Sequence, residues 1–194
     1  IAHLLDKLQF VEKKVELLDL SSFGDIDSVI HLAAQASVPL SISDFKQSST
    51  TNLLSSICIL DFCAKENIPL VYASSSAVYG EMEVGKDGEE SVDLISPYAV
   101  DKYAIELYSQ VLKEIFDLSS IGLRFFNVYG PKQDPSSPYS GVISIFIDRM
   151  LKQLPIYVNG GRQTRDFIYI NDVVESFYKS LELVQAKTVC ERIT

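Results

Sequence analysis

Short apolar runs alternate along the chain with longer stretches in which apolar residues recur every three or four positions. Four runs of the first kind precede residue 130, at 15–18, 28–34, 70–74 and 120–126. Mostly apolar runs of this length are typical of strands buried on both faces of a parallel sheet. We therefore expect each of the four to form a parallel strand.

Two long amphipathic helices are predicted between these runs. The first covers 41–66, with Ser43 or Asp44 as its cap and 67–69 as its stop, and the second covers 97–116. Apolar residues with helical spacing in the first are Leu53, Ile57, Leu60 and Ala64. Alternation of strands and helices requires right-handed crossovers. The pattern therefore predicts an α/β fold of the Rossmann-like, doubly wound type, with helices on both faces of a parallel sheet.

The pattern changes after Gly130, where prolines and serines form a long loop. Beyond this loop the expected elements are a helix at 142–151, strands at 156–158 and 166–170, and a helix at 172–184 capped by Asn171 or Asp172. We place a boundary near Gly130, between a dinucleotide-binding domain at 1–130 and part of a smaller substrate-binding subdomain at 131–194.

Composition and charge exclude several functions. The chain has 194 residues, 47% of them hydrophobic, and a net charge of −9, which argues against a nucleic-acid partner. No apolar run reaches the length of roughly 18 residues that a membrane span needs, so we expect a soluble, cytoplasmic protein. The three cysteines, Cys58, Cys63 and Cys190, and the two histidines lack metal-site spacing. We expect buried thiols and no metal.

The candidate chemistry begins with Tyr98 and Lys102, which lie one helical turn apart within 97–116. An ammonium group on the same helical face favours the phenolate form and lowers the pKa of a tyrosine. Tyr98 is then a candidate general base. The run 74–76 supplies serine hydroxyls at the end of a predicted strand, where they can hydrogen-bond a reacting oxygen.

Three predicted strand ends carry small or polar residues, at 32–34, 74–76 and 126–127. In open α/β sheets the carboxyl ends of the strands converge on one ligand-binding crevice. Other polar residues have structural interpretations. We expect His31 to be a hydrogen-bonded core histidine and Asn52 to be a structural polar group, while Arg165 and Asp166 are either functional or a solvated ion pair.

Ordered motifs across nearly the whole chain resemble those of the extended short-chain dehydrogenase/reductase family. Within it the chain resembles the NAD-dependent 4-epimerases of UDP-glucose, UDP-N-acetylglucosamine and UDP-glucuronate. The matching segments are Asp19-Leu20, HLAAQASV at 31–38, Asn52, SSSAVYG at 74–80, SPYAVDK at 96–102, LRFFNVYGPKQDP at 123–135 and TRDFIYINDV at 164–173.

The resemblance implies roles for residues of three kinds. The catalytic residues would be Ser75, Tyr98 and Lys102, with Tyr98 as the base and Ser75 sharing the proton of the substrate's 4-hydroxyl. The residues that would bind NAD are Asp19, Leu20, Leu32, Ala33, Ala34, Tyr98, Lys102 and Phe126. The residues that would contact the nucleotide sugar are Ser37, Ser75, Tyr98, Asn127 and Arg165.

The implied reaction is epimerisation at C4 of a UDP-hexose or UDP-N-acetylhexosamine through a 4-keto intermediate, for polysaccharide or lipopolysaccharide precursors. The related 4,6-dehydratases place an Asp-Glu pair where this chain has Ser76 and Ala77, so the epimerase is favoured. The resemblance also implies a homodimer that forms through the two long helices, to which Leu60, Ile105 and Val111 could contribute.

The family begins with a strand and a Gly-x-x-Gly-x-x-Gly turn that binds pyrophosphate, whereas the first glycine here is Gly24. We therefore expect a Rossmann domain truncated at its N-terminus, a subdomain that lacks its C-terminal end, and poor NAD binding by this polypeptide alone. Two alternatives remain open. One is a dehydratase, reductase or decarboxylase reaction, and the other is an inactive fragment that retains only a dimerising helical face.

Overall fold

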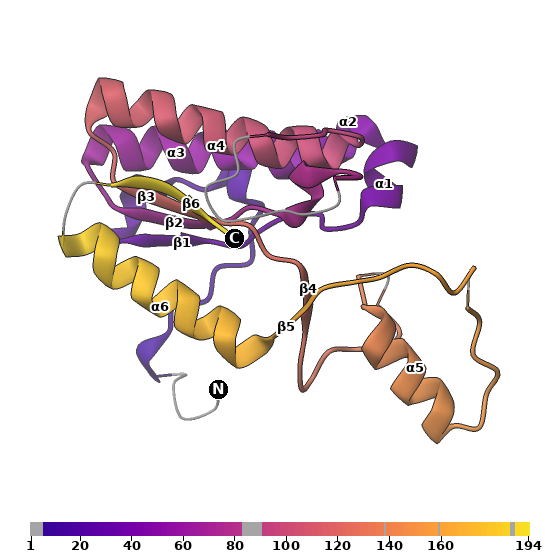
Figure 1. Ribbon diagram of the computed structural model, residues 1–194. Coiled ribbons are helices and arrows are strands. Elements are labelled where there is room, and N and C mark those ends of the chain that lie inside the picture. The colour runs from indigo at the N-terminus through magenta and orange to yellow at the C-terminus, as the bar shows by residue number, and fades with distance from the viewer. Residues whose placement is uncertain (1–5, 83–90, 138, 159, 187–188) are drawn as a thin grey trace.

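A four-stranded parallel sheet with helices on both faces organises the protein (Figure 1). The computed structural model describes residues 6–82, 91–137, 139–158, 160–186 and 189–194. The strands are β1 (Val29–His31), β2 (Leu70–Ala73), β3 (Ser120–Leu123) and β6 (Cys190–Ile193), in the spatial order β1-β2-β3-β6. Helices α3 (Ser55–Glu66) and α4 (Pro97–Phe116) cover one face and α6 (Ile170–Ala186) covers the other. The predicted α/β fold class is confirmed.

Helix α4 has the bounds that the sequence predicts. Its first residue is Pro97, which lacks an amide hydrogen that an N-terminal turn would leave unpaired. The Ser96 side chain caps the helix by accepting a hydrogen bond from the Ala99 amide at 3.2 Å. Asp117, at φ 58°, ends it in the left-handed conformation.

The predicted helix at 41–66 is divided into shorter segments. Helix α1 (Val38–Ser43) precedes α2 (Phe45–Ser49), a π-helical turn η4 (Thr50–Leu54) and α3. Asp44 is confirmed as a cap, because its carboxylate accepts a hydrogen bond from the Gln47 amide at 3.3 Å. Asn67, at φ 54°, ends α3 within the predicted stop. The π turn buries Asn52, whose side chain bonds the Gln35 amide at 2.7 Å and the Gln35 carbonyl at 3.1 Å.

Two predicted strands are wrong. Residues 15–17 form a 3-10 helix, η2 (Val15–Leu17), in which the amides of Leu17 and Leu18 bond the carbonyls of Lys14 and Val15. These short-range bonds replace those of a sheet neighbour. Residues 156–158 form no strand, and Tyr157 and Val158 are more than half exposed. Apolar character alone did not distinguish these segments from buried strands.

Two further differences concern the end of the chain. Strand β6 was not expected, and it pairs in parallel with β3, placing Cys190 opposite Ser120. Helix α6 begins at Ile170, so Asn171 and Asp172 lie in its first turn and the predicted caps are wrong. Strand β5 (Phe167–Tyr169) lies within the predicted 166–170 and pairs in parallel with β4 (Asn127–Tyr129).

The core has one hydrophobic cluster on each side of the sheet. Leu60 and Ile105, at 2% and 1% exposure, belong to the cluster between the sheet and the helices α3 and α4. Their assignment to a dimerising surface is therefore wrong, because side chains that fill the core cannot also meet a partner. Val111 of the same proposed surface is 52% exposed.

The segment that lies between β3 and α6 in the sequence is much less densely packed. It contains β4, β5 and helix α5 (Val142–Leu151), which lies away from the sheet in Figure 1. From residue 125 to residue 170, no described residue is buried. Helix α5 has the predicted bounds. The domain boundary near Gly130 stays a prediction.

Candidate active site

The ends of the parallel strands open onto a cleft of about 1120 Å³. Its walls come from the segments that follow β1, β2 and β3, from the first turns of α4 and from the region around residue 165. Residues with roles implied by the resemblance that line this cleft are Leu32, Ala34, Ser75, Tyr98, Lys102, Phe126, Asn127 and Arg165. Sequence reasoning thus identified eight residues that the fold brings to one cleft.

Tyr98 lies in the first turn of α4 and is 8% exposed. The Ser75 side chain forms a hydrogen bond with it. The Tyr98 amide donates to Ser41 Oγ at 3.2 Å, which ties the start of α4 to α1. Ser75 is itself held in place, because its Oγ accepts a hydrogen bond from the Ala77 amide at 3.1 Å. Both hydroxyls are therefore fixed beside the cleft.

Lys102 lies one turn further along α4 and is 4% exposed. Its Nζ donates to the Ala73 carbonyl at 2.7 Å and lies 5.9 Å from the centroid of the Tyr98 ring. Burial lowers the pKa of Lys102 to about 8, against the opposing effect of the Asp101 carboxylate. Ser49 Oγ, which has one proton to donate, lies 2.9 and 3.0 Å from the two carboxylate oxygens of Asp101.

The pKa of Tyr98 is shifted in the direction opposite to the sequence prediction. Burial raises it above the usual value for a phenol, and the hydrogen bond from Ser75 lowers it by less. Burial is the largest effect, and the Lys102 Nζ is bonded to a backbone carbonyl rather than to the phenol oxygen. Within this chain, Ser75 is the group that bonds the phenol and favours its ionised form.

Four residues with predicted roles do not line the cleft, namely Asp19, Leu20, Ala33 and Ser37. Asp19 accepts a hydrogen bond from Ser21 Oγ at 2.6 Å, and Leu20 packs against the core. Ser37 caps α1 by accepting a hydrogen bond from the Leu40 amide at 3.3 Å. Their roles toward a ligand stay predictions.

Asn127 and Arg165 lie on the exposed side of the cleft. Asn127 Nδ2 donates to the Asp166 carbonyl at 2.9 Å, so β4 and the segment before β5 are joined beside the cleft. Arg165 Nη1 donates to the Thr164 carbonyl at 2.7 Å. An exposed guanidinium group at the rim of a cleft is suited to bind a diphosphate.

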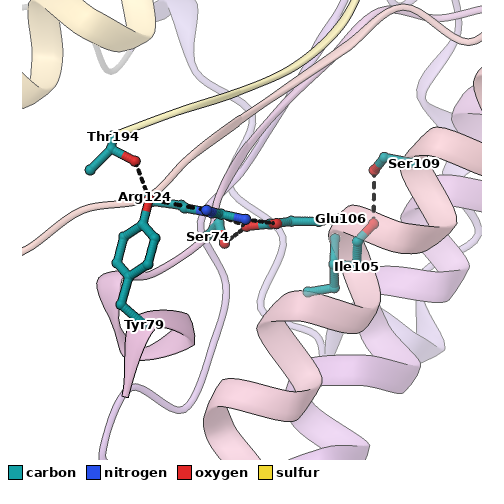
Figure 2. Close-up of polar contacts among 7 residues, drawn as sticks. All are labelled: Ser74, Tyr79, Ile105, Glu106, Ser109, Arg124 and Thr194. Atoms are coloured by element: carbon teal, nitrogen blue, oxygen red, sulfur yellow. Dashed lines mark hydrogen bonds and ion pairs between the residues drawn. The ribbon is translucent and has the colours of Figure 1, made fainter. Parts of the chain in front are cut away.

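The structure contains a second group of polar residues that sequence reasoning missed. Arg124 and Glu106 form a buried ion pair, with Nη2 2.6 Å from Oε2 and Nε 2.9 Å from Oε1 (Figure 2). Arg124 also donates from Nη1 to Tyr79 Oη at 3.0 Å, and Ser74 Oγ donates to Glu106 Oε1 at 2.5 Å. The available signal was a charged residue within each of two apolar patterns, at 106 and at 124.

Structural interpretations are confirmed for His31 and for Cys63, which is buried, whereas Cys58 and Cys190 are only partly buried. His31 is 7% exposed, and its Nε2 lies 2.8 Å from Ser56 Oγ. Burial, with a smaller effect from Lys102, lowers its pKa to about 4. Cys58, Cys63 and Cys190 are free thiols. Over the part of the chain that the structure describes, no group of His, Cys, Asp and Glu could hold a metal ion, and no helix is long and apolar enough to cross a membrane.

Comparisons with a family model and with curated relatives agree on one family. The sequence model described as the NAD dependent epimerase/dehydratase family matches residues 8–192. A putative UDP-glucose 4-epimerase of Methanocaldococcus jannaschii is 40% identical over 177 residues, which cover 88% of this chain and 58% of the relative. A UDP-glucose 4-epimerase of Mycolicibacterium smegmatis is 32% identical over 184 residues, which cover 90% of this chain and 58% of the relative. The chain thus spans 58% of the length of these two curated relatives.

Two solved structures show the same similarity in three dimensions. A UDP-N-acetylglucosamine 4-epimerase from Methanobrevibacter ruminantium M1, in complex with UDP-N-acetylmuramic acid, matches with a TM-score of 0.81 at 36% identity, over 89% of this chain and 57% of that chain. A UDP-glucuronic acid 4-epimerase from Bacillus cereus, in complex with UDP-glucuronic acid and NAD, matches with a TM-score of 0.85 at 32% identity, over 98% of this chain and 60% of that chain.

Proposed function

The chain belongs to the NAD dependent epimerase/dehydratase family, and from that membership we propose that it carries the catalytic residues of a UDP-sugar 4-epimerase. The substrate is a UDP-hexose or UDP-N-acetylhexosamine that is used for polysaccharide or lipopolysaccharide precursors. The observation that carries the proposal is the convergence of Ser75, Tyr98 and Lys102 at one cleft, because these residues can remove a proton from a sugar hydroxyl.

The cleft residues fit a dinucleotide cofactor. Ala34 and Ala73 occupy little of the cleft, Phe126 offers a flat apolar side chain, and Lys102 places a cation in its wall. We assign Leu32 and Ala34 to the cofactor diphosphate, and Phe126 to the edge of the nicotinamide. When bound there, NAD would supply a reversible hydride acceptor for C4 of the sugar. Its use in this chain is part of the proposal.

Tyr98 acts as the base in this proposal, with Ser75 as its hydrogen-bond partner. The hydroxyl of Ser75 bonds the substrate's 4-hydroxyl and the phenol, so it aligns the proton for transfer. Because burial raises the pKa of Tyr98, its ionised fraction, and with it the rate, increases as the pH rises toward that pKa. The Lys102 Nζ lies 5.9 Å from the centroid of the Tyr98 ring, so its positive charge would stabilise the phenolate once the phenol has lost its proton.

The nucleotide part of the substrate lies against the exposed region. We assign the sugar or phosphate to Asn127 and the diphosphate to Arg165, for which a guanidinium fork is suited. Ser37, Asp19, Leu20 and Ala33 keep the roles that the resemblance implies, and binding of NAD or substrate would have to bring them into contact. Ser76 and Ala77 also line the cleft, and neither offers the acid-base pair that elimination of water requires.

Homodimer formation through the long helices remains part of the proposal, with a revised surface. Leu107, Val111 and Ile115 follow one another at intervals of four residues on α4 and are 44%, 52% and 65% exposed. This apolar stripe replaces Leu60 and Ile105 as the dimerising surface. Val111→Asp should convert the dimer to a monomer in sedimentation experiments, and a wild-type monomer would contradict the assignment.

The proposed function is tested by Tyr98→Phe in the complete natural polypeptide that contains these residues. The assay follows interconversion of UDP-glucose with UDP-galactose, and of the corresponding N-acetylhexosamine and uronate pairs, in the presence of NAD. We expect a loss of about 10²–10⁴-fold in kcat. Tyr108→Phe is the matched control, because Tyr108 lies on the same helix at 46% exposure.

Two outcomes would contradict the proposal. Unchanged epimerisation by Tyr98→Phe would remove the assigned base. Release of water or carbon dioxide from the sugar, or a net change in nicotinamide absorbance, would assign the cleft to a dehydratase, decarboxylase or reductase.

A further inference from the structure

Four buried polar residues, two in the cleft wall and two behind it, have no role in the reaction described so far. We name Ser74, Tyr79, Glu106 and Arg124 the anchor cluster (Figure 2). We propose that Glu106 and Arg124 are positioning residues, which hold helix α4 in register with the end of β2 so that Tyr98 meets Ser75. This inference rests on the proposed function, because it concerns the same proton-transfer pair.

The first support is the register between α4 and the end of β2. Three α4 residues at intervals of four form hydrogen bonds with the last residue of β2 and the two residues that follow it. Tyr98 bonds Ser75, Lys102 bonds Ala73, and Glu106 bonds Ser74. Residues at this spacing lie on one face of a helix. A shift of α4 along the strand would therefore disturb all three contacts together.

The second support is the rigidity of the ion pair. Glu106 is fully buried and Arg124 is 3% exposed. Both oxygens of the carboxylate bond the guanidinium, and Oε1 also accepts from Ser74 Oγ. A buried pair with two parallel bonds has one favourable geometry, because any other arrangement leaves charge without a partner. The end of β3, the end of β2 and the middle of α4 are thus joined at one point.

The third support is a connection from Arg124 to the cleft wall. Its Nη1 donates to Tyr79 Oη, and its Cζ lies 5.0 Å from the centroid of the Tyr79 ring. The Tyr79 ring stacks on Phe126 at 6.3 Å between centroids and 17° between planes. Tyr79 and Phe126 both line the cleft, whereas Glu106 and Arg124 do not. The ion pair therefore acts on the site only through other residues.

The register has a chemical consequence. The hydrogen bond from Ser75 lowers the pKa of Tyr98, against the larger effect of burial. Loss of the register weakens this bond, so the pKa of Tyr98 rises. The rate then reaches its maximum at a higher pH, while the sites for the nucleotide, at Asn127 and Arg165, are unaffected.

The test combines Glu106→Gln with Arg124→Met in the complete natural polypeptide. Removing both charges together while keeping the side-chain volumes is compatible with folding. We expect kcat to fall about 10–100-fold with KM changed less than about threefold, because misplacement of reacting groups affects the chemical step. The pH profile of kcat should move to higher pH. Ser74→Ala, which retains the ion pair, should produce a smaller change in the same direction.

The matched control is Ser109→Ala. Ser109 is a fully buried serine on α4 whose Oγ donates to the Ile105 carbonyl at 2.9 Å (Figure 2). It also forms a hydrogen bond with the Tyr72 side chain of β2, so it tests whether the ion pair, rather than any polar contact between α4 and β2, holds the register. Its replacement should leave the pH profile of kcat unchanged. An equal shift of the profile in Ser109→Ala and in the double variant would overturn the inference, since any buried polar group would then have the same effect.

A second measurement separates this inference from the proposed function. In protein labelled with carbon-13 at the phenol carbon of tyrosine, the Tyr98 resonance is identified by its absence in Tyr98→Phe. Without substrate, the double variant and Ser74→Ala should both move this resonance at a fixed, mildly alkaline pH, and Ser109→Ala should not. If Ser74→Ala leaves the Tyr98 resonance in place, the positioning role is wrong. If the resonance moves but no UDP-sugar is epimerised, the proposed function alone is wrong.

Discussion

The two sides of the cleft are packed in very different ways. Helix α4 buries seven of its residues, among them Tyr98 and Lys102, whereas from residue 125 to residue 170 no described residue is buried. The proposed proton-transfer groups therefore lie where a side chain cannot move without disturbing the core. The residues proposed to hold the nucleotide sugar lie where they can rearrange. The difference indicates a cleft with fixed chemistry and adaptable recognition.

Two arginines give the most direct test of this contrast. Arg124 lies in the packed side and pairs with Glu106, while Arg149, on α5, has its Cζ 5.2 Å from the centroid of the Tyr157 ring and donates to the Pro155 carbonyl. Arg124→Met should lower the free energy of unfolding by about 3–5 kcal/mol, because it leaves a buried carboxylate without its partner. Arg149→Met should cost under about 1 kcal/mol.

Urea denaturation of both variants measures the difference. Equal losses would show that the two regions contribute alike to stability and that the contrast in burial has no energetic counterpart.

A second prediction separates activity from stability on the packed side. Lys102→Met should lower kcat/KM by roughly 10²–10³-fold, since the cation beside Tyr98 is lost. The same change should raise the free energy of unfolding at neutral pH. Because burial lowers the pKa of Lys102 to about 8, the folded protein pays to keep this group protonated below that pH.

The pH dependence of the free energy of unfolding tests the sign of this effect. From about pH 8 to 10 the unfolded chain binds more protons at Lys102 than the folded chain, so the wild-type stability rises with pH in that window. The rise should be absent from Lys102→Met. Lys113→Met is the control, because Lys113 pairs with Asp117 at 2.6 Å on the surface of the same helix. A loss of stability in Lys102→Met at neutral pH would contradict the assignment.

The third prediction concerns the loss of folding stability at acidic pH. His31 has its pKa lowered to about 4, chiefly by burial, so its contribution to stability is complete above 6.5, the usual pKa, and is lost as the pH falls toward 4. The loss should approach about 3 kcal/mol, at 1.36 kcal/mol for each pKa unit. Ser56 Oγ donates to the Asn52 carbonyl at 2.5 Å, so His31 Nε2 carries the proton of the His31–Ser56 bond.

Thermal or urea unfolding at several values between pH 4 and 6.5 measures this loss. His31→Gln should flatten the dependence, and a slope unchanged by the substitution would place the acid sensitivity elsewhere.

The smallest effects on stability are expected on the loosely packed side. Asn127→Ala and Arg165→Ala should each change the free energy of unfolding by less than about 0.5 kcal/mol, because both side chains are exposed. Each should raise KM for the nucleotide sugar by about fivefold to twentyfold with little change in kcat. Arg162→Ala, a neighbouring exposed arginine, is the control for nonspecific charge effects. A fall in kcat with unchanged KM would show that this side takes part in the chemistry.

Local signals in the sequence were sufficient to predict helices whose ends are marked by capping or terminating residues. The predicted helix at 97–116 has the bounds of α4, and Asp44 is a helix cap as expected, although the helix it begins is the short α2. The convergence of Ser75, Tyr98 and Lys102 was also predictable, because parallel strand ends meet at one edge of a sheet.

Properties that depend on distant neighbours were not predictable. The pKa of Tyr98 rises because of burial, which spacing along a helix does not report. Leu60 and Ile105 fit a helical surface stripe as well as a core, and only packing decides between them. The pairing of Glu106 with Arg124 joins a helix to a strand end, so neither residue's local pattern identifies its partner. Strand β6 is short and includes two charged residues.

The pairing of β3 with β6 has a consequence during synthesis of the protein. Roughly 70 residues separate the two strands, and ribosomes add about 5–20 residues each second. The edge of β3 therefore has no strand partner for about 3–14 s, until β6 has been synthesised. Arg124, which directly follows β3, is uncovered for the same time. During this interval the nascent chain is open to pairing with other strands. The anchor cluster, through the bond of Tyr79 to Thr194, is completed only when the residues after β6 have been made.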